Sequence, residues 1–453
     1  MLGWSVLILV GVLGLLWIWQ RRLESHAADQ VRKNLEDARE RGVDRAIAQH
    51  PLIETQRCIG CASCITACPE SGVIELVNGV AQVVYGSRCI GHAKCAEACP
   101  VGALHVGLGT IAGRADLPIL DEWQQTTVPG LFVAGELGGI ALVRNAIEQG
   151  TRAVTQIARQ ATRAREQLRA DSLDLLIVGA GPAGLAASLK AHECGLSYLT
   201  IDEQDLGGTV RKYPRHKLTM TQPVDLPVAG RMERREYLKE ELIELWEDIA
   251  TRFDLRLGLG TKLTAVQRVD GGFLSSTTQG EIRSRFVVLA LGRRGIPRRL
   301  GVPGEELDHV FYQLVDAAHY HHQRLLVVGG GDSAIEAATA LANQPGNQVM
   351  LSYRKAHFFR IKQRNEERLQ EYAREGRIRL ALSSEVQRFE RGAVELTLSG
   401  EDHPRVERLE NDHAFIFAGG EPPYPLLKHA GVLFGDSIRL DSSEPSTSTA
   451  GAT

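Results

Sequence analysis

The hydrophobic and polar positions divide the chain into segments of different kinds. Leu2 to Trp19 is an uncharged run of 18 residues, and a charge-rich stretch with apolar residues at helical spacing follows it to residue 50. From Leu173 onward, short apolar runs alternate with glycine loops and helical patterns. This alternation predicts a doubly wound α/β domain. A second apolar strand and glycine loop begin at Leu325 and predict a second domain of the same kind.

The uncharged N-terminal run has the length of a membrane-spanning helix. Its 18 residues are just enough to cross a hydrocarbon core of about 30 Å. Tryptophans stand near both ends, and Arg21 and Arg22 follow at once. A cleaved signal peptide is the alternative, because Ser25-His26-Ala27 resembles a cleavage site, but no positive charge precedes the run. We therefore expect a single-pass helix at residues 1–20 in the inner (cytoplasmic) membrane, with the catalytic domains in the cytoplasm.

Composition narrows the classes of function. A net charge of −3 in 453 residues gives no electrostatic reason to expect nucleic-acid binding. Seven of the eight cysteines lie between Cys58 and Cys99, and Cys194 stands apart. Cysteines bunched inside a long chain favour metal ligation over a disulfide framework.

The bunched cysteines form a motif that occurs twice. Residues 57–69 contain four cysteines at two-, two- and three-residue intervals, the last followed by proline. The motif returns 31 residues later, over residues 88–100, with His92 at one cysteine position. This arrangement resembles the two-cluster bacterial ferredoxins over about 50 residues, and it implies a ferredoxin-like α+β iron–sulfur domain.

The resemblance also implies how the ligands are shared between the clusters. Three cysteines of each copy hold one cluster, and the cysteine before proline reaches the other. The first cluster would be held by Cys58, Cys61, Cys64 and Cys99, and the second by Cys68, Cys89, Cys95 and His92. Three interpretations of the second cluster remain open: ligation by His92, a three-iron cluster without it, or loss of the cluster. Zinc bound by the first four cysteines is a further alternative.

The first glycine loop has the context of a dinucleotide site. A strand, a G-x-G-x-x-G pattern and a helix follow one another, and Asp202 ends the next strand. The glycines bring the backbone close to a pyrophosphate at a helix N-terminus, and the carboxylate, or that of Glu203, bonds a ribose hydroxyl. The candidate residues of this loop are Gly179, Gly181, Pro182, Ala183 and Gly184.

Together the two loops resemble those of thioredoxin-reductase-like flavoproteins, which pair a FAD domain with an inserted NAD(P) domain. Gly207 and Gly208 match a further FAD-binding position of that family. The residues at 352–360 lie where the family reads the 2′-phosphate, so we favour NADPH over NADH. The implied residues of the second site are Gly329, Gly331, Asp332, Ser333, Ala334, Arg354, Lys355 and Arg360.

Two departures from this family shape the functional hypothesis. The stretch 310–320 lacks the Cys-x-x-Cys that thioredoxin reductases carry before the second loop, and Ala183 leaves no cysteine in the first. Too few residues remain after 424 for the element that closes the FAD domain. That element occurs upstream at residues 127–139, with Gly135 and Glu136 as candidate FAD contacts. We therefore expect a circularly permuted FAD domain.

These patterns give a complete expected architecture. It combines the α+β ferredoxin-like domain with an α/β flavoprotein of two Rossmann-like dinucleotide-binding domains and one N-terminal transmembrane helix. The expected segments are a transmembrane helix at 1–20, a helical stalk at 21–50, the ferredoxin domain at 51–107, the permuted closing segment at 108–170, the FAD domain at 171–297, the NAD(P) domain at 298–410, a return to the FAD domain at 411–435 and a disordered tail at 436–453.

The expected function is electron transfer between NAD(P)H, FAD and 4Fe-4S clusters. A nicotinamide delivers two electrons at once and a cluster takes one, and a flavin handles both. The expected partner is a ferredoxin, a quinone or a membrane redox protein, and the resemblance also admits a homodimer. No obligatory catalytic acid, base or nucleophile is evident. Reduction of a small-molecule disulfide or other organic substrate, and a non-enzymatic redox-sensing or assembly role, are the alternatives.

Overall fold

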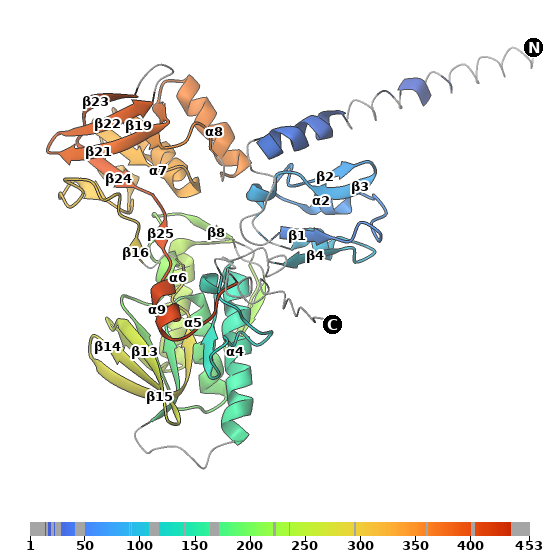
Figure 1. The fold of residues 1–453 in the computed structure, drawn as a ribbon, viewed down its shortest axis with the longest axis vertical. Coiled ribbons are helices and arrows are strands. Elements are labelled where there is room, and N and C mark those ends of the chain that lie inside the picture. Colours follow the sequence, from blue (N-terminus) through green and yellow to red (C-terminus); the bar gives the residue numbers. More distant parts are fainter. Residues whose placement is uncertain are drawn as a thin grey trace, which may run out of the picture. The chain divides into compact units, whose positions relative to one another are not determined.

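The computed structural model describes most of the chain (Figure 1). The described residues are Gly14, Trp17–Trp19, Arg22 and ranges 29–40, 50–89, 91, 93–107, 117–139, 142–163, 172–220, 223–234, 236–293, 296–358, 361–399 and 404–435. The chain forms two compact units. The first unit contains residues 1–107, 330–332 and 356–371, and the second unit contains the remainder.

The prediction of a transmembrane helix is wrong. Among the described residues, no helix combines the length and the apolar content needed to cross a bilayer. Most of residues 1–20 lie outside the described residues, and the ones described there, Gly14 and Trp17–Trp19, are helical. At 1.5 Å per residue, an 18-residue run reaches roughly 27 Å, the lower limit for a span, so its apolar character alone was a weak basis. The predicted location in the inner membrane depended on this helix and is therefore wrong as well.

The cysteine-rich part of the first unit is built from two antiparallel strand pairs and two short helices. Strands β1 and β4 pair antiparallel, as do β2 and β3. Each copy of the cysteine motif contributes one helix, α2 or α3, which carries one buried cysteine. The elements are β1 (His50–Ile53), α2 (Ser63–Ala67), β2 (Ile74–Val77), β3 (Val80–Val83), η1 (Gly86–Arg88), α3 (Lys94–Glu97) and β4 (Leu104–Gly107).

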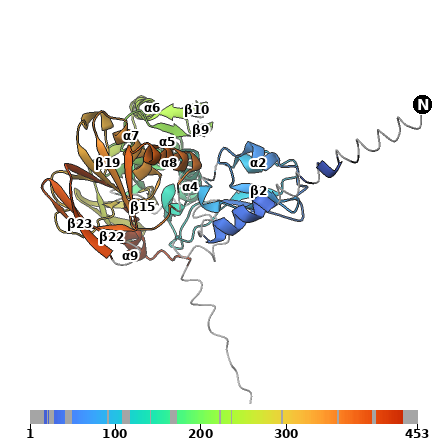
Figure 2. The same ribbon diagram turned by 90° about the horizontal axis from the view of Figure 1, so that it is seen from above.

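Residues 29–40 form a helix that packs on this domain (Figure 2). Ala38 is fully buried against Val84, Asn34 donates to the Glu75 carboxylate at 3.3 Å, and Tyr85 donates to Asp37 at 3.2 Å. One face of the predicted stalk is therefore a packing surface. Residues 41–49 lie outside the described residues.

The second unit contains a seven-stranded sheet, and the first glycine loop follows one of its central strands. The strand order is β12-β7-β6-β15-β14-β13, and β5 pairs with β15. Strands β12, β7, β6, β15 and β5 run parallel, whereas β13, β14 and β15 form an antiparallel meander. The strands are β5 (Leu131–Val133), β6 (Leu173–Val178), β7 (Tyr198–Asp202), β12 (Leu257–Leu259), β13 (Leu263–Val269), β14 (Gly272–Thr277) and β15 (Gly280–Leu289).

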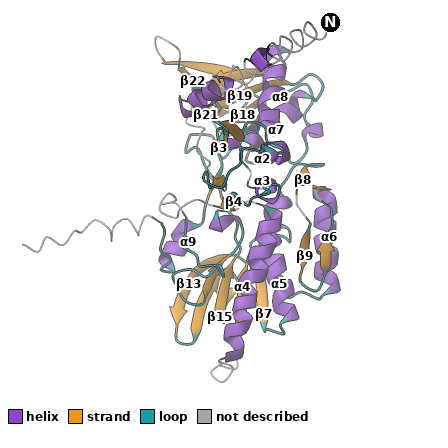
Figure 3. Ribbon diagram, turned by 90° about the vertical axis from the view of Figure 1, so that its right-hand side faces the viewer, coloured by secondary structure: helices purple, strands orange, loops and turns teal. Residues whose placement is uncertain are grey.

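Helices cover this sheet, and α4 lies beside α5 (Figure 3). Ile147 and Ile157 of α4 are fully buried against the sheet and α5. Helix α4 spans Val143–Arg163, within the segment expected at 108–170. The helices of this region are α4, α5 (Pro182–Glu193) and α6 (Lys239–Arg252), with 3-10 turns η3 (Glu136–Gly138) and η5 (Gly208–Val210). Two small hairpins lie between η5 and α6 in sequence: β8 (Leu218–Met220) with β11 (Glu236–Leu238), and β9 (Val224–Leu226) with β10 (Gly230–Met232).

A second parallel sheet carries the second glycine loop. Its five strands follow the order β17-β24-β18-β19-β20, and the antiparallel sheet β21-β22-β23 adjoins it in sequence. These elements are β17 (Val310–Phe311), η6 (Ala317–His319), β18 (Arg324–Val328), α7 (Asp332–Ala342), β19 (Gln348–Tyr353), α8 (Gln363–Arg374), β20 (Ile378–Leu382), β21 (Ser384–Glu390), β22 (Ala393–Ser399), β23 (Pro404–Glu410) and β24 (His413–Ile416).

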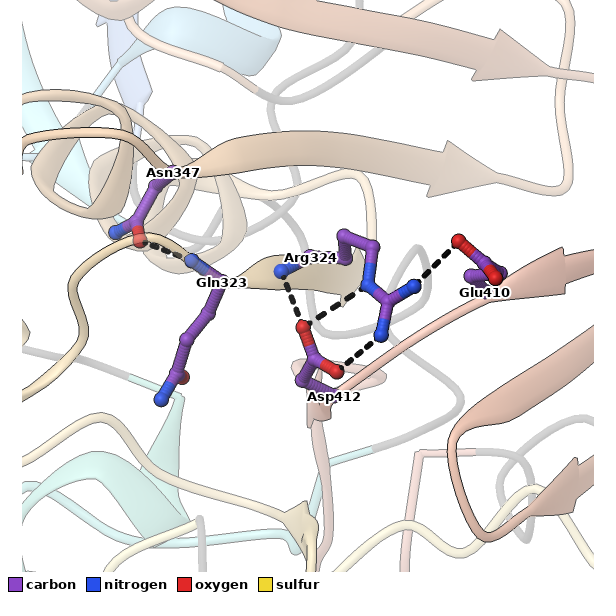
Figure 4. A network of polar contacts seen from close by, with 5 residues as sticks. All are labelled: Gln323, Arg324, Asn347, Glu410 and Asp412. Carbon is purple, nitrogen blue, oxygen red and sulfur yellow. Dashed lines mark hydrogen bonds and ion pairs between the residues drawn. The ribbon is translucent and has the colours of Figure 1, made fainter.

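A network of polar contacts holds the central strands of this sheet together (Figure 4). Arg324, at the start of β18, donates through Nε and Nη2 to Asp412 beside β24, at 3.1 and 2.6 Å, and its backbone N–H donates to the same carboxylate at 2.8 Å. Glu410 also pairs with this guanidinium. The Arg324 cation holds the pKa of Asp412 below its usual range.

After β24 the chain returns to the first sheet. Strand β25 (Gly420–Glu421) pairs with β16 (Ile296–Pro297), and α9 (Tyr424–His429) follows. Leu427 and Phe434 are buried in the same cluster as Leu131 and Val133 of β5. Thus two segments that lie far apart in the sequence, around residues 131 and 427, share one core with the sheet that carries the first glycine loop.

Candidate functional site: two cysteine cavities and two glycine loops

The first cysteine set lines a small cavity. Cys58, Cys61, Cys64 and Cys99 all face it, together with apolar residues such as Leu76 and Leu104. Three of these cysteines come from the first copy of the motif, and Cys99 comes from the second. Backbone N–H groups point at two of the sulfurs: that of Ala81 donates to Cys58 Sγ at 3.4 Å, and that of Ala103 donates to Cys99 Sγ at 3.2 Å.

The loop around this cavity requires glycine. Gly60 has φ of +68°, and a Cβ there would lie 2.3 Å from the carbonyl oxygen of Gly79 in the β2–β3 turn. Ala62 also has a positive φ, of 59°, immediately before α2. The backbone therefore turns tightly between Cys58 and Cys64, and their thiols face one space.

The second cysteine set lines a separate cavity. Cys68, Cys89 and Cys95 face it, with Gly91, Ala93 and Glu70 among the other lining residues. Ala93 has φ of +64°, which repeats the conformation of Ala62 at the matching position of the motif. His92, the predicted fourth ligand, lies outside the described residues. Each cavity is thus lined by cysteines from both copies of the motif.

Burial makes free thiolates costly at most of these positions. It raises the pKa of Cys64, Cys68 and Cys89, and it raises the pKa of Cys95 to about 12 with help from the neighbouring thiols. Cys61 differs, because a hydrogen bond with Ser63 lowers its pKa. Buried thiolates in sets of this kind need cations between them, which iron supplies.

The cysteines of each set surround a space and do not converge on one point. Within the part of the chain that the structure describes, no three His, Cys, Asp or Glu side chains are grouped closely enough to hold a single metal ion. Four thiols around a cavity, with N–H groups directed at their sulfurs, fit an iron–sulfur cluster.

The first glycine loop connects β6 to α5 with very little space around it. Gly179 has φ of +110°, and a Cβ there would lie 2.4 Å from the carbonyl oxygen of Ala290. A Cβ at Gly184 would lie 1.7 Å from the Gly179 carbonyl oxygen. Gly208 lies close to Gly181, since a Cβ added at Gly208 would lie 3.1 Å from the Gly181 Cα. Pro182 and Ala183 open α5. Glycine pairs such as these leave room for a diphosphate beside the backbone.

The two acidic candidates have different surroundings. The Asp202 carboxylate accepts the backbone N–H of Ala180 at 2.7 Å and that of Gln204 at 2.8 Å. Glu203 is exposed and pairs with Lys262 at 2.9 Å. Asp202 therefore fixes the glycine loop itself, and its two oxygens retain further acceptor sites for a ribose hydroxyl.

The upstream segment enters this site through β5. Leu131 to Val133 pair in parallel with Val287 to Leu289 of β15. Beyond the strand, a Cβ on Gly135 would lie 3.2 Å from Ala183 Cβ, and the Gly135 N–H donates to Gln149 Oε1 at 2.7 Å. Glu136, half-buried, begins the 3-10 turn η3. The structure thus brings Gly135 next to the first glycine loop.

Gln149 is a site residue that sequence reasoning missed. It is 7% exposed and lies on α4, 14 residues after the glycine that it contacts. The available signal was a polar residue on the apolar face of a helix. Without knowledge that α4 packs against the loop, this signal pointed to no partner.

The second glycine loop repeats the geometry of the first. Gly329 has φ of +148°, and a Cβ there would lie 2.6 Å from the carbonyl oxygen of Phe417. Gly331 faces open space. Asp332 begins α7, and its carboxylate accepts the Lys362 N–H at 2.9 Å and Asn365 Nδ2 at 2.7 Å. Ser333 follows in α7 and is half-buried, whereas Ala334 is buried beneath the loop.

The predicted phosphate-reading residues are only partly described. Arg354 and Lys355 follow β19 and are both exposed. Arg360 lies outside the described residues. The two exposed cations stand after β19, the strand that follows the glycine loop and α7, where a nucleotide-binding domain reads the ribose.

Comparisons with known proteins agree with this geometry. Residues 176–451 match the model of the family described as pyridine nucleotide-disulphide oxidoreductase, and residues 50–100 match a 4Fe-4S dicluster domain. A ferredoxin–NADP reductase of Thermus thermophilus is 32% identical over 287 residues, which is 61% of this chain and 82% of that protein. One of Ignicoccus hospitalis is 28% identical over 59% of this chain and 84% of that protein.

A solved structure shares the fold. The bacillithiol disulfide reductase Bdr of Bacillus cereus superposes with a TM-score of 0.52 at 24% identity, and the match covers 57% of this chain and 82% of that one. The predicted resemblance and the predicted enzyme class are confirmed. The chain therefore belongs to the pyridine nucleotide-disulphide oxidoreductase family, as a thioredoxin-reductase-like FAD- and NAD(P)-dependent oxidoreductase that carries a 4Fe-4S dicluster domain ahead of its reductase domains.

Proposed function

We propose that this protein transfers electrons between NADPH and a ferredoxin-type one-electron protein carrier, with FAD at the first glycine loop and iron–sulfur clusters at the two cysteine cavities. The observation that carries the proposal is the division of the cysteines into two cavities, each lined by residues of both motif copies. The names of the ferredoxin–NADP reductases among its relatives support the same chemistry.

The residues proposed for each group combine the contacts above with the sequence motifs. Cys58, Cys61, Cys64 and Cys99 would hold the first cluster, and Cys68, Cys89 and Cys95 would hold the second, with His92 as the fourth ligand. Gly179, Gly181, Gly184, Gly207, Gly208 and Asp202 would hold FAD, with Gly135 and Glu136 on the side of β5. Gly329, Gly331, Asp332 and Ser333 would hold the nicotinamide nucleotide, with Arg354, Lys355 and Arg360 at its 2′-phosphate.

The chemistry needs a converter between electron pairs and single electrons. A bound flavin accepts hydride from a nicotinamide and exchanges single electrons with a cluster. The chain's own contribution is orientation. Asp202 and Gln149 fix the two backbone segments of the FAD cradle, and Gly135, which has no side chain, lies close to Ala183.

The order of segments also supports this function. The ferredoxin strand β4 ends at Gly107, and β5, which lies in the FAD sheet, begins at Leu131. We propose that the FAD domain is circularly permuted, because β5 and α4 precede the strands with which they pack. A short covalent connection raises the effective concentration of one redox centre near another.

The experiment is a cofactor count followed by turnover. Protein purified without oxygen is expected to contain one FAD and seven or eight irons, and to oxidise NADPH with ferricyanide or benzyl viologen as the acceptor. Four irons with no flavin would overturn the proposal. Turnover with bacillithiol disulfide but with neither dye would favour a disulfide reductase, and tight flavin binding without any turnover would favour a redox-sensing role.

A further inference from the structure

Charges from two distant stretches of the chain surround the second cysteine set. Cys68 and Glu70 both line this cavity, and Cys68 Sγ lies 3.2 Å from the Glu70 carbonyl oxygen. Glu70 in turn interacts with Arg88 and also with Lys362 and Asp332, which lie more than 200 residues further along the chain. All of these residues belong to the first unit. Charged residues of the second glycine loop (Asp332) and of the segment before α8 (Lys362) thus contribute to the charge around this cavity.

A direct ion pair also joins Arg88 of the ferredoxin motif to Glu366 of α8. Arg88 Nη2 lies 3.0 Å from Glu366 Oε2, and the two side chains are only 16% and 22% exposed. The guanidinium also lies 4.4 Å from the centre of the Tyr85 ring. Beside it, the Ser71 hydroxyl donates to Gln363 Oε1. Since Arg88 directly precedes Cys89, this pair joins α8 to the backbone of a proposed cluster ligand.

The start of α8 is itself fixed by the second glycine loop. Asp332 accepts a hydrogen bond from the Lys362 N–H, one residue before α8, and another from the Asn365 side chain in its first turn. Asn365 is 8% exposed, so the second bond is shielded from water. Glu366 follows Asn365 directly, and its position is therefore set by residues outside the ferredoxin motif.

We propose that Glu366 is a positioning residue for the second cluster, which holds the Arg88 guanidinium beside Cys89 and balances its charge. The inference rests on the proposed function, in that it requires a cluster in the second cavity. Reduction adds one negative charge to a cluster. A nearby cation stabilises that charge, and a carboxylate paired with the cation offsets the effect. The reduction potential of the second cluster is thus set in part by α8, from outside the ferredoxin fold.

The first cluster provides an internal reference. Among the described residues of segment 356–371, none lines its cavity, and the charged side chains Glu54 and Arg57 near Cys58 are about half exposed. Charges in that setting are screened by water and salt. A change at Glu366 is therefore expected to affect one cluster and leave the other unchanged.

The test is a redox titration of the full, cluster-loaded chain followed by low-temperature EPR. Glu366→Gln is expected to shift the midpoint potential of the second cluster upward, and Arg88→Gln to shift it downward. The double variant is expected to lie closer to wild type than either single variant, because the two shifts have opposite signs and the pair is removed as a unit. Glu367→Gln is the matched control, because it removes the same charge from an exposed position next to Glu366 on α8. Cys95→Ser identifies the signal of the second cluster.

The outcomes separate this inference from the proposed function. A wild-type protein without a second cluster signal would overturn the function proposed for that cavity. Two wild-type signals, combined with equal shifts of both clusters in Glu366→Gln or with no shift beyond that of Glu367→Gln, would overturn the role of Glu366 alone. A shift confined to the second cluster and absent in the control supports it.

Discussion

A methyl group added at Gly150 tests whether the upstream helix α4 belongs to the FAD cradle. Gly150 lies within α4, and a Cβ there would lie 2.1 Å from the carbonyl oxygen of Ala183, in the first turn of α5. The obstacle is backbone, which cannot rotate away as a side chain can. To restore ordinary contact at about 3.4 Å, the two helices must separate by roughly 1.3 Å.

The sign of the effect separates packing from intrinsic propensity. In an exposed helix, Gly→Ala stabilises by about 1 kcal/mol. Overpacking at a close helix contact costs about 1–3 kcal/mol, and the backbone obstacle places Gly150→Ala at the upper end. The net expectation is a loss of about 2 kcal/mol, or about 4–8 °C in the temperature of FAD release.

The assay is heating of the purified protein while the fluorescence of released FAD is recorded, with the flavin-to-protein ratio measured beforehand. Thr162→Ala is the control, because Thr162 is an exposed residue near the end of the same helix and its hydroxyl bonds only within α4. We expect the control to be neutral or slightly stabilising. An unchanged release temperature in Gly150→Ala, or an equal fall in both variants, would refute the packing of α4 on the first glycine loop.

Three further predictions concern the charge network, the first cluster and the nucleotide. Asp412→Asn is expected to lower the free energy of unfolding by about 1 kcal/mol at pH 7, after allowance for partial exposure. Arg324 lowers the pKa of Asp412 in the folded state. The ion pair therefore stabilises the fold above the unfolded pKa of about 3.9, and this stabilisation is lost as pH falls through the folded pKa. The difference in unfolding temperature between wild type and variant should thus shrink below about pH 4; a widening gap contradicts this. Cys64→Ser should lower the iron count by about four per chain while FAD stays bound, and an unchanged iron count would exclude Cys64 as a ligand. Arg354→Ala with Lys355→Ala should raise the KM for NADPH roughly tenfold and leave that for NADH unchanged; equal effects on both would remove them from 2′-phosphate recognition.

Local patterns in the sequence predicted the parts of the site that depend on local chemistry. Gly179 and Gly329 stand between a strand and a helix, and both adopt a positive φ with a carbonyl oxygen where a Cβ would be. The copies of the cysteine motif predicted two similar turns, and Ala62 and Ala93 adopt the same left-handed conformation. Requirements of this kind act over a few residues, so spacing alone reveals them.

Contacts between distant residues were not predictable in the same way. Arg88 and Glu366 are separated by 278 residues, and neither lies in a pattern that names the other. Asp202 was expected at a ribose, but its contacts with Ala180 and Gln204 depend on how far the glycine loop folds back over β7. The transmembrane helix predicted at residues 1–20 is wrong. That prediction used only the length and hydrophobicity of the segment, which do not determine its structure.

The pairing of β5 with β15 has a consequence for how this chain folds during synthesis. Leu131 leaves the ribosome roughly 150 residues before Val287, its partner in the sheet. At about 5–20 residues per second, β5 remains without that partner for roughly 8–30 s. During this interval its three buried side chains have no sheet to cover them. Apolar segments of this kind in a nascent chain are prone to aggregate, so a sheet strand that precedes its partners by this length increases the need for protection by chaperones.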